Sequence, residues 1–169
     1  IIINNYKYKE LSKMNEIAQN TVLISGGAGS MGLLVSDYIN SRDDFTLTAI
    51  HDPNYKGQEY KSYEDLTNIE EDVVLEFSPA SVINENIDSL LNSDADLIIG
   101  SSGVSSEMLS KLKTITDRKV IVIPNFSIGA AYQKLFSLAL SDNFISVIIT
   151  EKHHGKKHDA PSGTALDLA

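Results

Sequence analysis

The stretch Thr21-Val-Leu-Ile-Ser-Gly-Gly-Ala-Gly-Ser-Met-Gly32 decides the fold. Its first five residues form a short apolar run typical of a buried strand, and Gly27, Gly29 and Gly32 then satisfy the pattern G-x-G-x-x-G. From Met31 to Ile39, apolar residues recur at helical spacing. A strand, a glycine-rich turn and a helix in this order predict backbone amides that approach the pyrophosphate of a dinucleotide at a helix N-terminus.

Outward from this stretch, short apolar runs alternate with helical patterns. Residues 52–72 are polar and are predicted to be mostly loop. Continuous apolar strands that alternate with helices are typical of a parallel sheet covered on both faces. We therefore predict an α/β fold, a Rossmann-type doubly wound parallel sheet with its binding cleft at the carboxyl ends of the strands. The expected strands are 21–25, 45–50, 73–77, 96–99, 119–123 and 144–150, and the expected helices are 31–39, 82–91, 105–112, 128–138 and one that begins at 162.

Asp52 ends the second predicted strand, 20 residues beyond Gly32. At this distance from a glycine loop, a carboxylate can accept hydrogen bonds from the ribose hydroxyls of the adenosine. It would also repel the additional phosphate of NADP, so the sequence favours NADH. Lys56 is close enough in the sequence to reach that phosphate, so NADPH stays open. The structural alternative is a glycine-rich turn followed by an unrelated acidic loop residue.

A basic segment stands out near the carboxyl end: residues 151–165 read Glu-Lys-His-His-Gly-Lys-Lys-His-Asp-Ala-Pro-Ser-Gly-Thr-Ala. Three of the four His lie here, in a chain whose formal net charge is −9, and this local positive charge predicts an anionic ligand. The run Ser162-Gly-Thr164 opens a helix and offers amides and hydroxyls to a carboxylate. His is also the side chain best suited to proton transfer near neutral pH. The alternatives are a solvated basic loop, a metal site made by His153, His154 and His158, and a simple helix cap. We expect no metal.

Composition excludes several classes of protein. The chain of 169 residues has no Cys, which excludes disulfides, thiolate nucleophiles and Cys-based zinc sites. No apolar run approaches the roughly 20 residues that a membrane-spanning helix needs. An acidic chain is a poor general partner for nucleic acid or for an anionic membrane. We therefore expect a cytoplasmic protein with a small-molecule substrate.

Three motifs together resemble the dihydrodipicolinate reductase family. They are E-x-H-H-x-x-K-x-D-A-P-S-G-T-A from Glu151 to Ala165, G-x-x-G-x-M-G from Gly26 to Gly32, and Pro124-Asn-Phe-Ser-Ile-Gly129. The resemblance covers about residues 20–169. Two motifs depart from the family's usual pattern: Glu76-Phe-Ser78 stands where D-F-T is common, and Gly100-Ser-Ser-Gly103 stands where G-T-T-G is common. Both changes keep a short hydroxyl side chain.

The resemblance implies NAD(P)H-dependent reduction of 4-hydroxy-tetrahydrodipicolinate (or dihydrodipicolinate) to tetrahydrodipicolinate, in diaminopimelate and lysine biosynthesis. By the family pattern, His153 is the proton donor and Lys157 is its charged partner. The substrate carboxylates are expected to contact His154, Ser162, Gly163 and Thr164. The residues expected to contact the cofactor are Gly26, Gly27, Ala28, Gly29, Ser30, Met31, Asp52, Gly100, Ser101, Ser102, Pro124, Asn125 and Phe126.

The same resemblance predicts the domain organisation. Residues 1–20 are expected to be a poorly ordered extension, residues 21–126 the dinucleotide-binding domain, and residues 127–169 the beginning of a second, α+β domain for substrate binding and tetramer contacts. Family members run well past this point, so we expect the chain to be a fragment of a protein that forms a homotetramer when full length, and we expect residues 162–169 to fray. Two alternatives remain. One is another Rossmann dehydrogenase of small amino or keto acids, and the other is a non-catalytic dinucleotide-binding module or inactive fragment.

Overall fold

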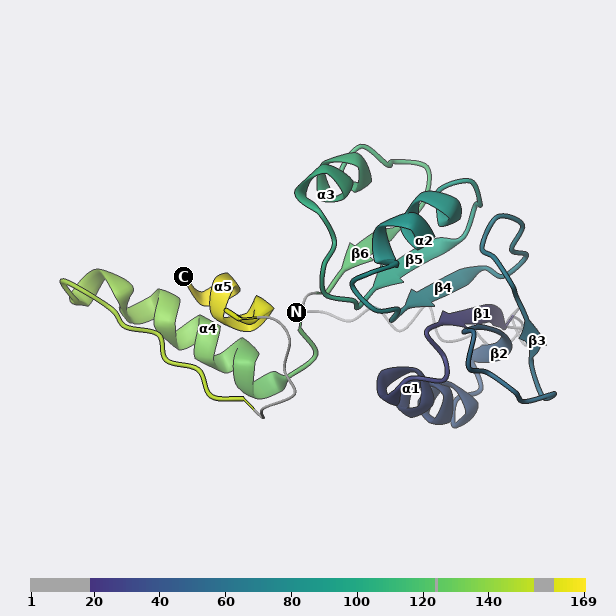
Figure 1. Cartoon of the computed structure of the whole chain (residues 1–169), viewed down its shortest axis with the longest axis horizontal. Helices are drawn as coiled ribbons and strands as arrows, with labels where there is room; N and C mark the ends of the chain where they lie inside the picture. The colour runs from purple at the N-terminus through teal and green to yellow at the C-terminus, as the bar shows by residue number, and fades with distance from the viewer. Residues whose placement is uncertain (1–18, 124, 154–159) are drawn as a thin grey trace, which may run out of the picture.

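The computed structural model describes residues 19–123, 125–153 and 160–169, and its centre is a six-stranded parallel sheet (Figure 1). The order of the strands across the sheet is β3-β2-β1-β4-β5-β6, and every neighbouring pair is parallel. This order is the one that defines the doubly wound dinucleotide-binding fold, so the predicted fold class is confirmed. The strands are β1 (Asn20–Ser25), β2 (Phe45–His51), β3 (Lys61–Ser62), β4 (Val73–Glu76), β5 (Asp96–Ile99) and β6 (Val120–Val122).

Helices cover both faces of this sheet. Figure 1 shows α1 (Ser30–Asn40) on one face, and α2 (Ile83–Leu90) and α3 (Ser106–Leu112) on the other. Side chains of a strand alternate between the two faces, and the two cores follow this rule. Val22 and Ile24 of β1 pack in the core on the α1 side, whereas Leu23 packs with Ile83, Ile87 and Met108 on the side of α2 and α3. The strands therefore bury both faces, as their continuous apolar sequence predicts.

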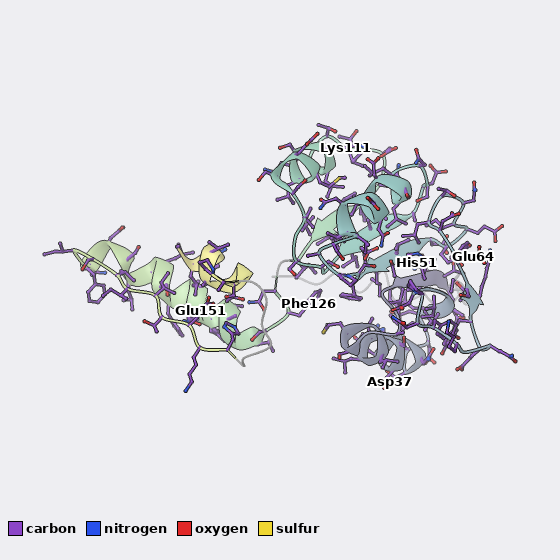
Figure 2. All side chains as sticks on the ribbon, viewed as in Figure 1. Asp37, His51, Glu64, Lys111, Phe126 and Glu151 are labelled. Atoms are coloured by element: carbon purple, nitrogen blue, oxygen red, sulfur yellow. The ribbon has the colours of Figure 1, made fainter. Side chains whose placement is uncertain are left out.

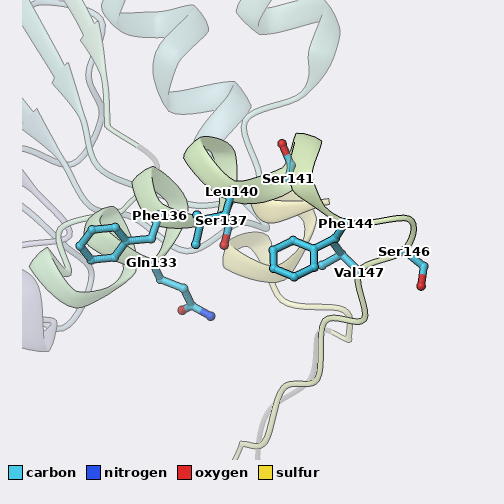
Figure 3. A pocket seen from close by; sticks show the side chains of 8 residues that line it. All are labelled: Gln133, Phe136, Ser137, Leu140, Ser141, Phe144, Ser146 and Val147. Carbon is cyan, nitrogen blue, oxygen red and sulfur yellow. The ribbon is translucent and has the colours of Figure 1, made fainter.

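The carboxyl-terminal part is built differently. It contains α4 (Ile128–Leu140), the short 3-10 turn η2 (Ser141–Asn143) and α5 (Gly163–Leu168), and Figure 1 shows α4 and α5 beside the sheet rather than on it. No residue of α4 is buried. A hollow of about 460 Å³ with mostly apolar walls lies between α4 and the segment that follows it. Phe136 and Phe144 are two of the residues that line it (Figure 3).

Two expectations from the sequence need correction. The predicted strand at 144–150 is wrong, because these residues pair with no strand among the described residues, and an apolar run becomes a strand only where a neighbour accepts its backbone hydrogen bonds. The segment 52–72 is mostly loop, as predicted, and contains the two-residue strand β3, whose Lys61 pairs with Ala49 of β2. Finally, β1 begins at Asn20, inside the expected extension. The rest of that extension lies outside the described residues. Among the helices that are described, none is both long and apolar enough to cross a membrane.

Candidate functional site

The glycine loop after β1 is a tight turn that only glycine can make at two positions. Gly26 has φ +78°, a region that residues with a Cβ rarely adopt, and a Cβ there would lie 2.8 Å from the backbone of Phe77. A Cβ on Gly32 would lie 2.6 Å from Cα of Gly27, so the first turn of α1 rests directly on the loop. The loop therefore brings backbone amides to the N-terminus of α1, where an anion is favoured.

Asp52 lies against this loop, as the spacing of the motif predicts. Its Oδ2 accepts a hydrogen bond from the amide of Ala28 at 3.0 Å, and its Oδ1 accepts one from the amide of Asn54 at 2.8 Å. Each carboxylate oxygen has a second lone pair that can receive another donor. The backbone thus fixes Asp52 beside the glycine loop with acceptor capacity to spare. Lys56 turns back on the loop after β2, where its Nζ donates to the carbonyl of Pro53 at 3.1 Å.

A cavity of about 500 Å³ opens between these groups, at the carboxyl ends of β1, β2 and β4. This is the edge where parallel sheets bind their ligands, and the volume lies in the range of cofactor sites. Three segments form its walls, namely the glycine loop, the end of β2, and the turn from β4 into α2. Its lining residues are Gly26, Ala28, Gly29, His51, Asp52, Pro53, Asn54, Phe77, Ser78, Pro79, Ser81, Val82 and Asn86.

Beneath this cavity lies a buried polar network that the sequence reasoning missed. Glu76 is 0% exposed, and its Oε1 accepts the amide of Ser78 at 2.6 Å. The side-chain amide of Asn86 donates to Oγ of Ser78 at 2.9 Å, that oxygen lies 3.0 Å from Oγ of Ser25, and Ser25 Oγ lies 3.0 Å from Nδ1 of His51. A polar residue at the end of each of three apolar strands was the available signal.

Farther along the sheet edge, two of the predicted cofactor residues that follow β5 contact Glu76. The amide of Gly100 and the hydroxyl of Ser101 both donate to the carbonyl of Glu76, at 2.9 and 3.2 Å. The ring of Phe126 meets the ring of Phe77 edge-on, with centroids 5.8 Å apart. Asn125 instead accepts the amide of Ser127 at 2.7 Å. Ser30, Met31 and Ser102 are exposed, and Pro124 lies outside the described residues.

The predicted substrate segment is described in part. Glu151, labelled in Figure 2, accepts the amide of Ser162 with both carboxylate oxygens, at 2.9 and 3.2 Å, and its Oε2 lies 3.7 Å from Nδ1 of exposed His153. Ser162 is buried, and its Oγ accepts the amide of Ala165 at 3.1 Å as the N-cap of α5. The structure thus brings His153 and Ser162 to one carboxylate, and the Ser162 amide expected to contact a substrate carboxylate is bonded to Glu151 instead. His154, Lys157 and His158 lie outside the described residues, and Gly163 and Thr164 lie in the first turn of α5.

A parallel sheet in this order, a glycine loop at a helix N-terminus and an acidic residue at the end of the next strand define a Rossmann-type dinucleotide-binding domain. The family model for the N-terminus of dihydrodipicolinate reductase matches residues 20–126, and the model for its C-terminus matches residues 129–169. The chain belongs to the dihydrodipicolinate reductase family.

Individual relatives agree with this assignment. The chain is 33% identical to a 4-hydroxy-tetrahydrodipicolinate reductase of Streptococcus pneumoniae and 32% identical to one of Streptococcus uberis, each over 157 residues. These alignments cover 88% of this chain and 62% of either relative, so the chain spans less than two thirds of their length.

Solved structures show the same likeness. A dipicolinate-bound dihydrodipicolinate reductase from Paenisporosarcina sp. TG-14 superposes with a TM-score of 0.67 at 27% identity, over 89% of this chain and 64% of that one. An apo scyllo-inositol dehydrogenase from Lactobacillus casei superposes with a TM-score of 0.55 over 73% of this chain and 42% of that one. Its identity of 17% shows the fold alone.

Proposed function

We propose that the chain carries out, or belongs to a protein that carries out, NAD(P)H-dependent reduction of 4-hydroxy-tetrahydrodipicolinate to tetrahydrodipicolinate, a step towards diaminopimelate and lysine. The observation that carries this proposal is the match of both family models to a chain whose glycine loop and Asp52 form a nucleotide cleft. The relatives are named for this reaction, and the solved relative holds dipicolinate, a planar dicarboxylate.

The proposed roles follow from the chemistry of the residues. A bound nicotinamide dinucleotide supplies the hydride, and the reduction also needs one proton. His153 is the proposed proton donor. The carboxylate of Glu151 lies 3.7 Å from Nδ1 of His153, so Nε2 is the ring nitrogen left for the substrate. Lys157 is the proposed charged partner of His153. The two substrate carboxylates are proposed to contact His154, Ser162, Gly163 and Thr164, since cations and amides are the groups that recognise carboxylates.

Activity is tested by following NADH oxidation with freshly generated substrate. Turnover by the 169-residue chain supports the proposal, and a full-length relative serves as the positive control. His153→Gln should lower kcat strongly and leave the KM for NADH near normal, because the lost group acts on the substrate and not on the nucleotide. NADH binding without turnover, with the relative active in the same assay, would instead favour a non-catalytic nucleotide-binding module.

We also infer a preference for NADH over NADPH. Asp52 is fixed by two backbone amides, so its negative charge cannot swing away from the additional phosphate of NADPH. Asp52→Ala should weaken NADH binding about tenfold or more, because hydrogen bonds to a charged group are lost, and should narrow the difference between the two nucleotides. Asp37→Ala, which removes an exposed carboxylate of α1, is the matched control. A wild-type chain that binds NADPH far more tightly than NADH would refute the inference. It would point to Lys56 as the residue that binds the additional phosphate.

Assembly and location complete the proposal. We infer a homotetramer for the full-length protein and a cytoplasmic location, both supported by the family to which the chain belongs. Light scattering on the purified full-length protein tests the assembly, and a monomeric mass would contradict it.

A further inference from the structure

The hydrogen bonds of the polar network at the nucleotide cleft run in one donor-to-acceptor order. This order determines which ring nitrogen of His51 carries the proton. The side-chain amide nitrogen of Asn86 faces three acceptors, Oγ of Ser78 at 2.9 Å, Oε2 of Glu76 at 3.4 Å and Oγ of Ser25 at 3.5 Å. Turning the amide around would set its oxygen against the oxygens of Glu76, which is unfavourable. Glu76 is 0% exposed, so water does not relieve such a contact. The NH₂ group of Asn86 is therefore the donor at the start of the chain of hydrogen bonds.

From this fixed donor the proton positions follow one after another. Oγ of Ser78 accepts from Asn86, so its own proton is available for Oγ of Ser25 at 3.0 Å. Oγ of Ser25 accepts that proton and in turn donates to Nδ1 of His51 at 3.0 Å. Each hydroxyl has one proton to donate, and in this arrangement both hydroxyl protons meet an acceptor within the network, whereas the reverse order would leave the proton of Ser78 without one. The result places His51 in the neutral form that carries its proton on Nε2.

His51 also lines the nucleotide cleft, beside Asp52. The edge of its ring with Nδ1 is turned to Ser25, so the other edge presents an N–H group, whereas neighbouring Asp52 presents only acceptor oxygens. A donor next to an acceptor suits the adenosine half of a dinucleotide, which has hydroxyl donors on the ribose and acceptor nitrogens in the purine.

We propose that Asn86 is a positioning residue that sets the tautomer of His51 through Ser78 and Ser25, and that His51 is thereby a fixed hydrogen-bond donor to an acceptor atom of the adenosine half of the nucleotide. The second part rests on the proposed function, because it requires that the cleft binds NADH. The first part stands on the geometry of the five side chains alone.

The direction of the network is tested by reversing it. In the double variant Glu76→Gln/Asn86→Asp, the negative charge moves from residue 76 to residue 86 and the net charge is unchanged. The amide oxygen of Gln at 76 can still accept the amide of Ser78, while the carboxylate at 86 is now an acceptor. Ser78 must then donate to residue 86, Ser25 to Ser78, and Nδ1–H of His51 to Ser25.

The tautomer is read by ¹⁵N NMR of histidine-labelled protein at a pH about two units above the ordinary His pKa of about 6.5, and His51→Gln identifies the signals. The expected result is Nε2–H in the wild type and Nδ1–H in the double variant, with the Kd for NADH raised threefold or more in the variant. Glu85→Gln, an exposed change on the same helix, should leave the tautomer and the Kd unchanged. A double variant that keeps Nε2–H, or a wild type with Nδ1–H, would overturn the proposal.

A second variant covers the case in which the double variant does not fold. Ser25→Ala removes the donor to Nδ1 of His51, so the Nδ1 resonance should move towards that of a free imidazole nitrogen. The Kd for NADH should rise about threefold to tenfold, as expected for weakening one hydrogen bond. No change in either quantity would overturn the proposal. If the wild type binds no NADH but the His51 tautomer still changes in the double variant, the role of Asn86 in setting the tautomer is supported. The proposed function is then the part that fails.

Discussion

Two helices, α2 and α4, show how differently the two parts of the molecule are held. The shorter helix α2 has 8 residues and buries Ile83, Ile87 and Leu90 completely against the sheet. The longer helix α4 has 13 residues and is richer in apolar side chains, yet none of them is buried. An apolar stripe makes a helix possible, but the partner surface decides whether the stripe stabilises the fold.

The largest expected effect is on the free energy of unfolding. It compares the same substitution, leucine to alanine, at a buried position of the sheet and at an exposed position of α4. Leu23 of β1 is 0% exposed, whereas Leu135 of α4 is 57% exposed. Leu23→Ala should lower the free energy of unfolding by about 2–5 kcal/mol, because it leaves a cavity in the core. Leu135→Ala should change it by at most about 0.5 kcal/mol. Urea unfolding followed by circular dichroism measures both. Equal losses of unfolding free energy in the two variants would show that Leu135 is buried in solution by another surface.

Glycine-to-alanine changes should act in opposite directions in the two parts. Gly26→Ala requires a positive φ and a contact of 2.8 Å with the backbone of Phe77, so it should cost about 1–3 kcal/mol and abolish NADH binding. Gly129 lies in the first turn of α4, where a Cβ would make only an ordinary contact of 3.7 Å with Oγ of Ser127, so Gly129→Ala should raise the helix content and stabilise α4 by up to about 1 kcal/mol. Thermal melts and NADH titrations of the two variants decide this, and a destabilised Gly129→Ala would contradict it.

Two N-cap serines provide a smaller comparison. Oγ of Ser105 accepts the amide of Met108 at the start of α3, and Oγ of Ser127 accepts the amide of Ala130 at the start of α4. Ser105→Ala should lower the stability of the sheet domain by about 1 kcal/mol, because α3 packs against the core. Ser127→Ala should reduce helicity without moving the main unfolding midpoint. A shift of that midpoint by Ser127→Ala would mean that the two parts unfold together.

The smallest expected effect depends on pH and concerns the sheet alone. Oδ2 of Asp72 accepts the amide and the hydroxyl of Thr21, at 2.8 and 2.7 Å, and these hydrogen bonds lower the pKa of Asp72 below its usual range. A carboxylate with a lowered pKa contributes stability above its ordinary pKa of about 4, and this contribution is lost as the pH falls through the lowered value.

Asp72→Asn should therefore cost about 0.5 kcal/mol at pH 7, since the site is exposed and screened by solvent. The difference between variant and wild type should shrink towards pH 2–3 (roughly the range below the ordinary Asp pKa). Unfolding titrations at several pH values measure it, and a difference that grows as the pH falls would be incompatible with this explanation.

The sequence was a good guide wherever local chemistry decides the structure. The strand 96–99 was predicted to the residue, and α1 and β2 within one residue at each end, because apolar runs between glycines and polar turns leave few alternatives. The place of Asp52 beside the glycine loop followed from the spacing of the motif. The strands and the helix depend on one segment each, and Asp52 depends on a fixed spacing from the glycine motif.

The errors arose where two distant segments must meet. Residues 144–150 have the composition of a strand but no paired neighbour among the described residues, and β3 has only two residues, Lys61 and Ser62, and no pattern of its own. The network of Ser25, Ser78 and Asn86 likewise could not be predicted from the sequence, since it depends on which face of β1 and α2 each side chain occupies. The roles predicted for residues 151–164 remain predictions.

The all-parallel sheet sets the order in which the chain can fold. Without a hairpin, every pairing joins residues far apart, and Thr21 at the start of β1 meets Asp72 of the segment leading into β4 across 51 positions. Such non-local contacts require loop closure before they contribute stability, so they slow folding. On a ribosome that adds about 5–20 residues per second, β1 leaves the exit tunnel several seconds before β4 does. For that interval the apolar side chains of both its faces and its unpaired backbone groups are exposed to water.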